Sequence, residues 1–330
     1  MRYLVTGSAG FIGHALSRRL LARGDAVVGI DSLNAYYDPA LKQARTSDLA
    51  ATSDLFQFKP VDFADQTALD AALAGEPFNA IIHLGAQPGV RYSLENPQAY
   101  IQSNIVGHLN LLELARARQV AMVYASSSSV YGGNTSVPFC VEDRVDHPVS
   151  LYAATKRADE LMSETYAHLY RIPLTGLRFF TVYGPWGRPD MAPWLFTSAI
   201  LEGRPIRVFN HGQLSRDFTY IDDIVSGIIA CLDNPPRDDG KPKAGGSAAP
   251  HRIYNIGNNK PEPLMDFIAQ IEAATGKRAV MEMTDMQPGD VAQTWADIDA
   301  IASELGYAPT TPISVGIPRF VEWYKEWQSR

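Results

Sequence analysis

Short apolar runs alternate with longer segments of helical spacing over the first half of the chain. The runs at residues 2–5, 26–30, 78–84 and 173–180 are each followed by a polar residue or a glycine. Segments between them, such as 14–24 and 104–118, carry apolar residues at helical spacing. Runs without polar alternation are typical of buried parallel strands. Strands that alternate with helices in this way predict an α/β fold built on a doubly wound parallel sheet.

The character of the chain changes after the run at 173–180. Residues 181–193 are rich in proline, glycine and aromatic residues, a composition typical of a structured loop that carries function. The chain is expected to return to the first domain through residues 215–232, with a helix capped by Asp222 or Asp223. We therefore predict one domain of residues 1–180 with 215–257, and a smaller one of 181–214 with 258–330.

Composition narrows the class of protein. A chain of 330 residues suggests two domains, and 46% apolar with 20% charged residues describes a globular protein with a large core. A net charge of −7 argues against partners such as nucleic acid or an anionic membrane. No apolar run approaches the roughly 20 residues that cross a bilayer, and no signal peptide is expected. Cys140 and Cys231 are few and unpatterned, which predicts neither a disulfide framework nor a metal site and favours the cytoplasm.

The first strand leads directly into the glycine-rich segment TGSAGFIG at residues 6–13, followed by a helical segment. Strand, glycine turn and helix form the context of a dinucleotide-binding site. Gly7 permits a tight turn, Gly10 lets the backbone approach a pyrophosphate, and Gly13 lets the helix pack on the strand. The phosphates are expected at the helix N-terminus. The spacing is G-x-x-G-x-x-G rather than G-x-G-x-x-G.

Asp31 follows the second expected strand, about twenty residues beyond the glycines. A carboxylate there accepts hydrogen bonds from an adenosine ribose and repels a 2′-phosphate, which favours NAD over NADP. Its alternative role is to cap a loop. Asp62, near the end of the next expected strand, is a candidate contact to adenine.

Three side chains carry the candidate chemistry. Tyr152 and Lys156 are four residues apart in a segment of helical composition, so they share one face. A free tyrosine has a pKa near ~10 and is a poor base, but the lysine ammonium and a nicotinamide cation stabilise its phenolate. Ser127, at the end of an apolar run, is placed to hydrogen-bond a substrate hydroxyl and relay its proton. Either feature alone is more often a surface pair or a loop; here both follow a dinucleotide motif.

Two helical segments, residues 104–118 and the one that carries Tyr152, are apolar on more than one side. They are either core helices or an exposed seam that pairs with its copy in a two-fold homodimer. We favour the homodimer.

Taken together, these residues resemble the extended short-chain dehydrogenase/reductase family of nucleotide-sugar enzymes. The similarity covers nearly the whole chain: TGSAGFIG, Asp31, SSSSVYG, the Tyr152 and Lys156 pair, RFFTVYGP, RDFTYIDD and YNIGNN occur in order. Within that family, AQPGVRYSLENP, HPVSLYAATK, GPWGRPDMA and MQPGDV are most similar to the UDP-glucuronate 4-epimerase branch. The resemblance implies a Rossmann-type sheet and a smaller C-terminal α/β domain that binds the nucleotide sugar.

The resemblance also implies an activity, the NAD-dependent 4-epimerisation of UDP-glucuronate to UDP-galacturonate through a transient 4-keto sugar. Tyr152, assisted by Ser127, deprotonates the hydroxyl on carbon 4, NAD takes the hydride and returns it to the other face, and Lys156 binds the nicotinamide ribose. The implied cofactor contacts are Gly7, Gly10, Phe11, Ile12, Gly13, Asp31, Asp62, Leu84, Ala86, Tyr152 and Lys156.

A 4-ketouronic acid tends to lose carbon dioxide, so its carboxylate has to be held out of alignment with the ketone. The resemblance implies that Thr181 and Arg188 anchor it, with groups near Ser128 and Ser129; an arginine suits a carboxylate because it binds with two parallel bonds. Arg91 is a second candidate.

The nucleotide end of the substrate is expected to meet Arg216 at a phosphate and Asp290 at the uridine ribose. Gln287 stands where related galactose epimerases often carry a second phosphate-binding arginine, a departure that affects this side of the phosphate site.

The nearest rivals are sugar-nucleotide 4,6-dehydratases and UDP-glucuronate decarboxylases, which usually carry an acidic residue just before VYG. Ser128 and Ser129 occupy those positions, which disfavours dehydration and, less strongly, decarboxylation. Epimerisation of neutral UDP-hexoses stays open, with Arg188 as the discriminating residue. The intact set of Ser127, Tyr152 and Lys156 argues against a non-catalytic NAD-binding scaffold.

Overall fold

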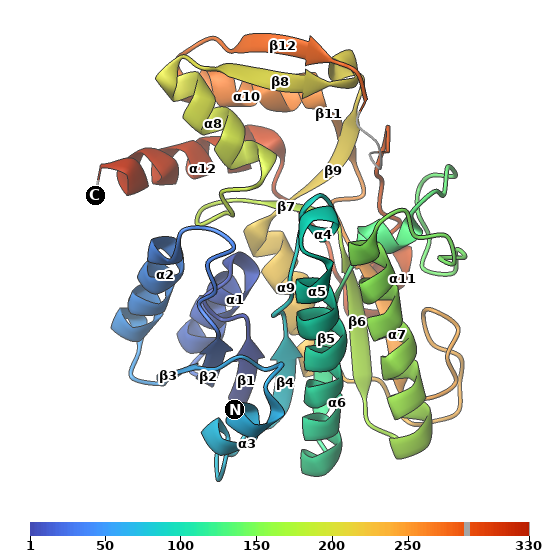
Figure 1. The fold of residues 1–330 in the computed structure, drawn as a ribbon. Helices are drawn as coiled ribbons and strands as arrows, with labels where there is room; N and C mark the ends of the chain where they lie inside the picture. Colours follow the sequence, from blue (N-terminus) through green and yellow to red (C-terminus); the bar gives the residue numbers. More distant parts are fainter. Residues whose placement is uncertain (287–290, 330) are drawn as a thin grey trace.

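A seven-stranded parallel sheet forms the centre of the larger lobe in the computed structural model, which describes residues 1–286 and 291–329 (Figure 1). Its strand order, β10-β6-β5-β4-β1-β2-β3, reverses direction at β1, so the predicted doubly wound sheet is confirmed. The strands are β1 (Arg2–Thr6), β2 (Ala26–Asp31), β3 (Phe56–Pro60), β4 (Ala80–His83), β5 (Ala121–Ser127), β6 (Leu174–Phe179) and β10 (His251–Ile256).

Successive residues of β1 enter different cores, because side chains of a strand alternate between the faces of its sheet. Tyr3 and Val5 pack in one buried cluster, and Leu4 packs in a second. The first cluster lies under α1 (Phe11–Ala22), α2 (Pro39–Thr52) and α9 (Ile221–Asp233). The second lies under α3 (Gln66–Ala72), α6 (Gly107–Arg118) and α7 (Leu151–Tyr170). Helices therefore cover both faces, which is why the strands are apolar throughout.

The smaller lobe lies beyond the carboxyl edge of the large sheet (Figure 1). It holds a three-stranded sheet, β11-β9-β7, and a two-stranded sheet, β12-β8. Its elements are β7 (Thr181–Tyr183), α8 (Ala192–Glu202), β8 (Pro205–Phe209), η3 (Asn210–Gly212), β9 (Ser215–Tyr220), β11 (Pro261–Pro263), α10 (Leu264–Thr275), β12 (Val280–Thr284) and α12 (Ile313–Gln328); α11 (Asp299–Leu305) packs beside β10.

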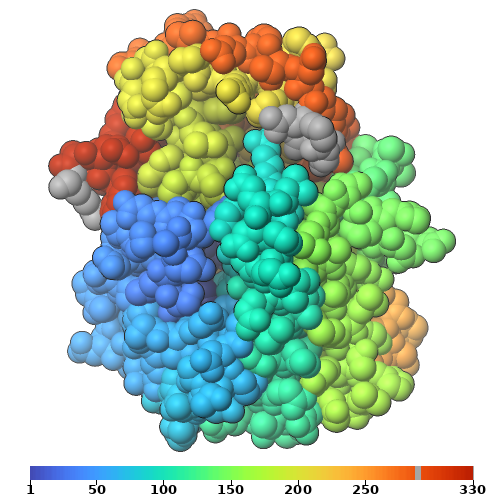
Figure 2. Space-filling view, viewed as in Figure 1, coloured from blue at the N-terminus to red at the C-terminus, as the bar shows by residue number. Residues whose placement is uncertain are grey.

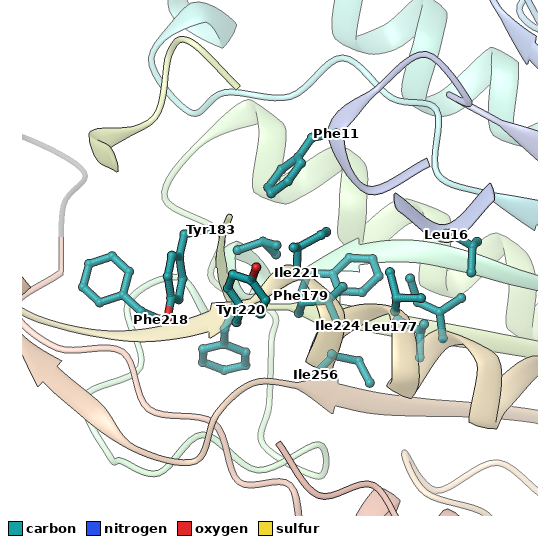
Figure 3. Close-up of a cluster of buried hydrophobic side chains, with 14 of the residues drawn as sticks. Phe11, Leu16, Leu177, Phe179, Tyr183, Phe218, Tyr220, Ile221, Ile224 and Ile256 are labelled. Carbon is teal, nitrogen blue, oxygen red and sulfur yellow. The ribbon is translucent and has the colours of Figure 1, made fainter. Parts of the chain in front are cut away.

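One apolar core runs from the large sheet into the smaller lobe (Figure 3). Leu177 of β6 and Ile256 of β10 share this cluster with Ile224 of α9. Tyr183 and Phe218, from two strands of the small sheet, belong to the same cluster. The two lobes are therefore joined by buried apolar surface. Such an interface restricts the motion of one lobe relative to the other.

The predicted cap of α9 is wrong. Tyr220 is the N-cap residue and makes no side-chain cap bond, because the two aspartates already lie inside the first turn. There they face the positive end of the helix dipole. Asp223 instead accepts hydrogen bonds from the backbone N–H groups of Thr310 (3.1 Å) and Thr311 (3.0 Å), which ties the C-terminal segment to the large lobe.

Residues 104–118 are helical as expected, but residues 104–106 belong to a π-helical segment that runs directly into α6 (Gly107–Arg118). The π-helical segment η1 (Ile101–Val106) precedes α6, and the short helices α4 (Tyr92–Glu95) and α5 (Pro97–Tyr100) precede η1. In the part of the chain that the structure describes, no helix is long and apolar enough to span a bilayer.

A buried ion pair holds α7 to the sheet. Arg178 of β6 donates from Nε and Nη2 to the two carboxylate oxygens of Glu160 on α7, at 2.9 and 3.0 Å. Ser126 of β5 adds a bond of 2.7 Å to the same carboxylate. Burial acts to raise the pKa of Glu160, but the Arg178 guanidinium holds that pKa below its usual value. The glutamate is therefore ionised and fully bonded inside the protein.

Substituting Glu160→Gln is expected to lower the free energy of unfolding by about 3 kcal/mol, because Arg178 would keep a buried charge without its counterion. Chemical denaturation followed by circular dichroism measures this loss. Glu202→Gln is the matched control, since Glu202 pairs with Arg204 at the surface and should leave stability almost unchanged. Equal effects of the two substitutions would contradict the assigned role of the buried pair.

Candidate active site

A cavity of about 380 Å³ opens at the carboxyl edge of the large sheet. Figure 2 shows the surface hollowed between the blue N-terminal segments, the teal α4–α5 region and the yellow-green α8. In parallel α/β sheets ligands bind at this edge, where the strand order reverses. Its walls come from β7, from α7 and from the segments that follow β1, β2, β3, β4, β5, β6 and β7: they include Gly7, Gly10, Phe11, Ile12, Gly13, Asp31, Asp62, Leu84, Ala86, Ser127, Ser128, Ser129, Tyr152, Lys156, Thr181 and Arg188.

The glycine turn after β1 is too tight for side chains at two positions. Gly7 has a φ of +68°, and a Cβ there would lie 2.7 Å from the backbone nitrogen of Gly85. A Cβ on Gly13 would lie 2.1 Å from the carbonyl oxygen of Gly7. Helix α1 starts after Gly10 without a side-chain cap, and its first residues line the cavity. This N-terminus therefore presents backbone N–H groups suited to a phosphate.

Asp31 ends β2 and faces the same cavity. Its carboxylate accepts from the N–H of Leu33 at 2.8 Å and lies 4.0 Å from the Lys42 ammonium. Burial raises the pKa of Asp31, while Lys42 and the Leu33 N–H act in the opposite direction. Lys42, which also binds the side chain and backbone of Asn34, was not predicted from the sequence.

The three predicted catalytic side chains lie around one cavity. Ser127 is the last residue of β5, and its hydroxyl accepts from the N–H of Ser129 at 3.1 Å, at the start of η2 (Ser128–Tyr131). Tyr152 and Lys156 are on the first turns of α7, whose start is fixed by the Ser150 side chain bonding to Ala153. Strand β5 and helix α7 therefore bring groups together that are separate in the sequence.

Lys156 has a buried partner that the sequence reading missed. Its Nζ donates to Asp159 at 2.9 Å, and the two side chains are 3% and 0% exposed. Burial raises the pKa of Asp159 to about 7, although the Lys156 ammonium opposes the shift. The buried His83 is bonded to Thr6 at 2.7 Å, and burial first, then the Lys156 charge, lowers its pKa to about 3. The lysine is therefore held by a buried acid one helical turn away.

Arg188 enters the cavity from the loop after β7 with its guanidinium already oriented. Its Nε and Nη2 donate to the two carboxylate oxygens of Asp190, at 3.0 and 2.6 Å. The Tyr36 hydroxyl, 3.0 Å from the same carboxylate, fixes Asp190 in turn. Both partners were missed, although Asp190 stands two residues after Arg188 and Tyr36 stands in the NAYYDP segment that follows Asp31.

Four predicted substrate contacts lie together, and two do not. Ser128, Ser129, Thr181 and Arg188 line the cavity. Arg91 lies outside it, with its guanidinium 5.1 Å from the ring centre of Phe209. 

Arg216 lies on β9, also outside the cavity lining, and its Nη1 donates to the carbonyls of Ser215 (3.0 Å) and Ala292 (3.2 Å). Asp290 and Gln287 lie outside the described residues. The roles predicted for all of these side chains stay predictions.

Residues 3–257 match the family described as the NAD dependent epimerase/dehydratase family. The chain is 52% identical to an uncharacterized 37.6 kDa protein of Escherichia coli O111:H-, with 99% of each chain covered. It is 47% identical to a probable UDP-glucuronate 4-epimerase of Rhizobium meliloti (strain 1021), over 99% of this chain and 97% of the relative. The crystal structure of a UDP-glucuronic acid 4-epimerase from Bacillus cereus, in complex with UDP-glucuronic acid and NAD, superposes with a TM-score of 0.87 at 34% identity, over 99% of this chain and all of the other.

The buried Lys156–Asp159 pair predicts a pH dependence of stability. Because the pKa of Asp159 is about 7 in the folded protein and 3.8 when unperturbed, the folded state retains this proton between those values. Its contribution to the free energy of unfolding therefore falls as pH rises through this window, by at most about 1.4 kcal/mol per pH unit. An Asp159→Asn variant lacks this dependence.

Urea denaturation of the wild type and Asp159→Asn at pH 5, 6 and 8 measures the effect. The free energy of unfolding of the variant, relative to that of the wild type, should increase between pH 5 and pH 8. A difference that stays constant would mean that Asp159 is already ionised at pH 5.

Proposed function

The chain belongs to the NAD dependent epimerase/dehydratase family, and we propose that it converts UDP-glucuronate to UDP-galacturonate by NAD-dependent 4-epimerisation. The observation that carries this proposal is the place of Arg188. Its guanidinium lines the same cavity as the Tyr152 phenol. A cation that can recognise a carboxylate therefore lines the same cavity as the candidate base, and a uronic acid needs both.

The described residues fit NAD. The turn at Gly7 and Gly13 leaves no room for side chains, the uncapped start of α1 suits a pyrophosphate, and Asp31 offers a carboxylate to a ribose. Asp62, Leu84 and Ala86 are further proposed contacts to the cofactor, and they line the same cavity. When bound, NAD supplies a reversible hydride acceptor, so that no external oxidant is consumed.

Tyr152 is proposed to take the proton from the hydroxyl on carbon 4 of the sugar, assisted by the Ser127 hydroxyl. Lys156 provides a fixed positive charge one helical turn from Tyr152, and Asp159 holds that ammonium in place. After the 4-keto sugar has turned over in the cavity, Tyr152 returns the proton to the oxygen. The net reaction inverts carbon 4 and leaves the oxidation state of the sugar unchanged.

Arg188 and Thr181 are proposed to hold the sugar carboxylate, with Ser128 and Ser129 beside them. Decarboxylation requires the carbon–carbon bond to the carboxylate to align with the ketone, so a fixed carboxylate suppresses it. No acidic side chain stands at Ser128 or Ser129, which disfavours a dehydratase that needs an acid there. Decarboxylation of UDP-glucuronate and epimerisation of neutral UDP-hexoses are the alternative activities.

We also propose that the two lobes divide the ligands. Residues 1–180 with 215–257 would bind NAD, and residues 181–214 with 258–330 would bind the nucleotide part of the sugar. Arg216 is the proposed phosphate contact, and Asp290 the proposed contact to the uridine ribose. Arg216 lies on β9, at the start of the 215–257 segment, and β9 pairs with β7 and β11, so the proposed phosphate contact lies where the two segments meet.

Cytoplasmic location is a further proposal. Both cysteines, Cys140 and Cys231, are free thiols. Burial raises the pKa of each to about 12, which makes these thiols poorly reactive. Two unpaired cysteines are typical of a reducing compartment.

We propose that the protein is a homodimer paired through α6 and α7. These neighbouring helices expose large apolar side chains: Leu109 is 39% exposed, Leu161 53% and Leu169 60%. The two helices lie side by side on one face of the large sheet (Figure 1). Pairing with a second copy would bury this apolar surface and build a four-helix contact around a two-fold axis.

Purified protein with NAD and UDP-glucuronate, without added reductant, is expected to form UDP-galacturonate, seen by proton NMR. The same ratio of the two sugars should be reached from either side. Tyr152→Phe should lower kcat by at least about 100-fold, because the general base is lost, and should retain bound NAD. UDP-pentose with release of carbon dioxide, or full activity of the variant, would contradict the proposed function.

Leu161→Glu is expected to shift the protein from twice the mass of one chain to a single chain in size-exclusion chromatography with light scattering, because a charge would enter the paired helices. Leu195→Glu is the matched control, since Leu195 is a helical leucine, 52% exposed, on α8 of the smaller lobe. A monomeric wild type, or a dimer that survives Leu161→Glu, would refute the proposed interface.

A further inference from the structure

Arg45 on α2 is a fully buried arginine that binds backbone oxygens of two distant loops. Its Nη1 donates to the carbonyl of Ala9 at 3.0 Å. Its Nη2 donates to the carbonyl of Trp186 at 2.6 Å and to that of Gly187 at 3.2 Å. One guanidinium therefore links the glycine turn after β1 to the loop after β7.

The second of these loops has an unusual backbone. Trp186 has a φ of +63°, in the left-handed region that bulky side chains rarely adopt. Such a conformation persists only where surrounding contacts determine it. The indole packs against His14 (4.9 Å between ring centres) and Trp323 (5.4 Å), and Arg45 binds the carbonyl. Arg188 follows two residues later, so this backbone sets where its side chain begins.

The other end of the link is the proposed cofactor site. Ala9 lies within the glycine turn, and Lys42, three residues before Arg45 on α2, lies 4.0 Å from Asp31. Tyr37, whose hydroxyl accepts from Arg45 at 2.7 Å, also lines the cavity. Helix α2 thus contacts the phosphate turn, the ribose carboxylate and the loop that carries Arg188.

We propose that Arg45 is a positioning residue that fixes the Arg188 loop relative to the glycine turn, and so sets both the preference for a uronic acid and the protection of its 4-keto form from decarboxylation. This inference rests on the proposed function. To hold the carboxylate, Arg188 has to lie at a defined distance from carbon 4 of the sugar. Carbon 4 is positioned against the cofactor, and the cofactor is bound at the glycine turn. A direct bridge between the two loops gives this distance a structural basis.

Arginine is required for this role because its planar fork carries five N–H donors in fixed directions. A lysine keeps the charge but cannot reach carbonyls on both loops with one rigid group. Arg45→Lys should therefore preserve the net charge and loosen the Trp186–Gly187 backbone. Arg278→Lys is the matched control, because Arg278 is 91% exposed and pairs with Glu272 far from the cavity.

The first measurement is calorimetric titration of NAD-saturated protein with UDP-glucuronate and with UDP-glucose, which lacks the carboxylate. The ratio of the two affinities should fall roughly tenfold in Arg45→Lys and stay at the wild-type value in Arg278→Lys. A loss of affinity that is equal for both ligands, or an unchanged ratio, would overturn the proposal.

The second measurement is the product partition, followed by NMR and by release of carbon dioxide. Relative to UDP-galacturonate, decarboxylated product should rise several-fold in Arg45→Lys, because the carboxylate is held less firmly. Unchanged partition would overturn the proposal. If Arg45→Lys fails to fold, Tyr37→Phe removes one hydrogen bond from Arg45, and it should shift both readouts in the same direction by a smaller factor; no shift would count against the proposal.

Failure of the proposed function can be distinguished from failure of the role proposed for Arg45. A wild type that binds UDP-glucuronate in preference to UDP-glucose but forms no UDP-galacturonate would refute the assigned reaction. The affinity ratio of Arg45→Lys would still test whether Arg45 positions Arg188.

Discussion

The parallel order of the large sheet is the constraint on which the candidate active site depends. Parallel strands present their carboxyl ends at one edge, so the glycine turn after β1, Asp31 at the end of β2 and Ser127 at the end of β5 meet there. Helix α7 packs against β5 and β6 and places Tyr152 and Lys156 at the same edge. Burial of apolar surface on both faces fixes the sheet, and the geometry of the site follows from it.

Charged groups are buried behind this edge in matched sets. The Glu160 carboxylate accepts from Arg178 and Ser126, which offsets the cost of removing it from water. The Lys156–Asp159 pair is less complete, because one oxygen of Asp159 has no hydrogen-bond partner among the described residues. Burial therefore raises the pKa of Asp159 to about 7, because too few hydrogen bonds replace the water that the carboxylate has lost. Burying this pair costs free energy of folding, and the same pair fixes the position of the Lys156 ammonium, one helical turn from Tyr152.

The sequence predicted those features whose cause is local. A glycine turn needs φ > 0 at Gly7, and a four-residue spacing puts Tyr152 and Lys156 on one face of a helix. Contacts that depend on tertiary packing could not be predicted in this way. Arg45 reaches a carbonyl 141 residues away, and no spacing rule links those positions. The same limit applies to Arg91, whose place over the Phe209 ring is set by the packing of two lobes.

The bidentate contact between Arg188 and Asp190 bears on how a uronic acid could be held. Asp190 occupies the Nε side of the guanidinium, so a sugar carboxylate must use the edge formed by the two Nη groups or displace Asp190. Binding at the Nη edge keeps Arg188 in a fixed plane, because Tyr36 and Asp190 support it from behind. A carboxylate fixed on such a support can stay out of line with the ketone while the rest of the ring turns over. If Arg188 holds the sugar carboxylate as proposed, selectivity for the acidic sugar and resistance to decarboxylation have the same physical cause, a guanidinium that Asp190 and Tyr36 already orient.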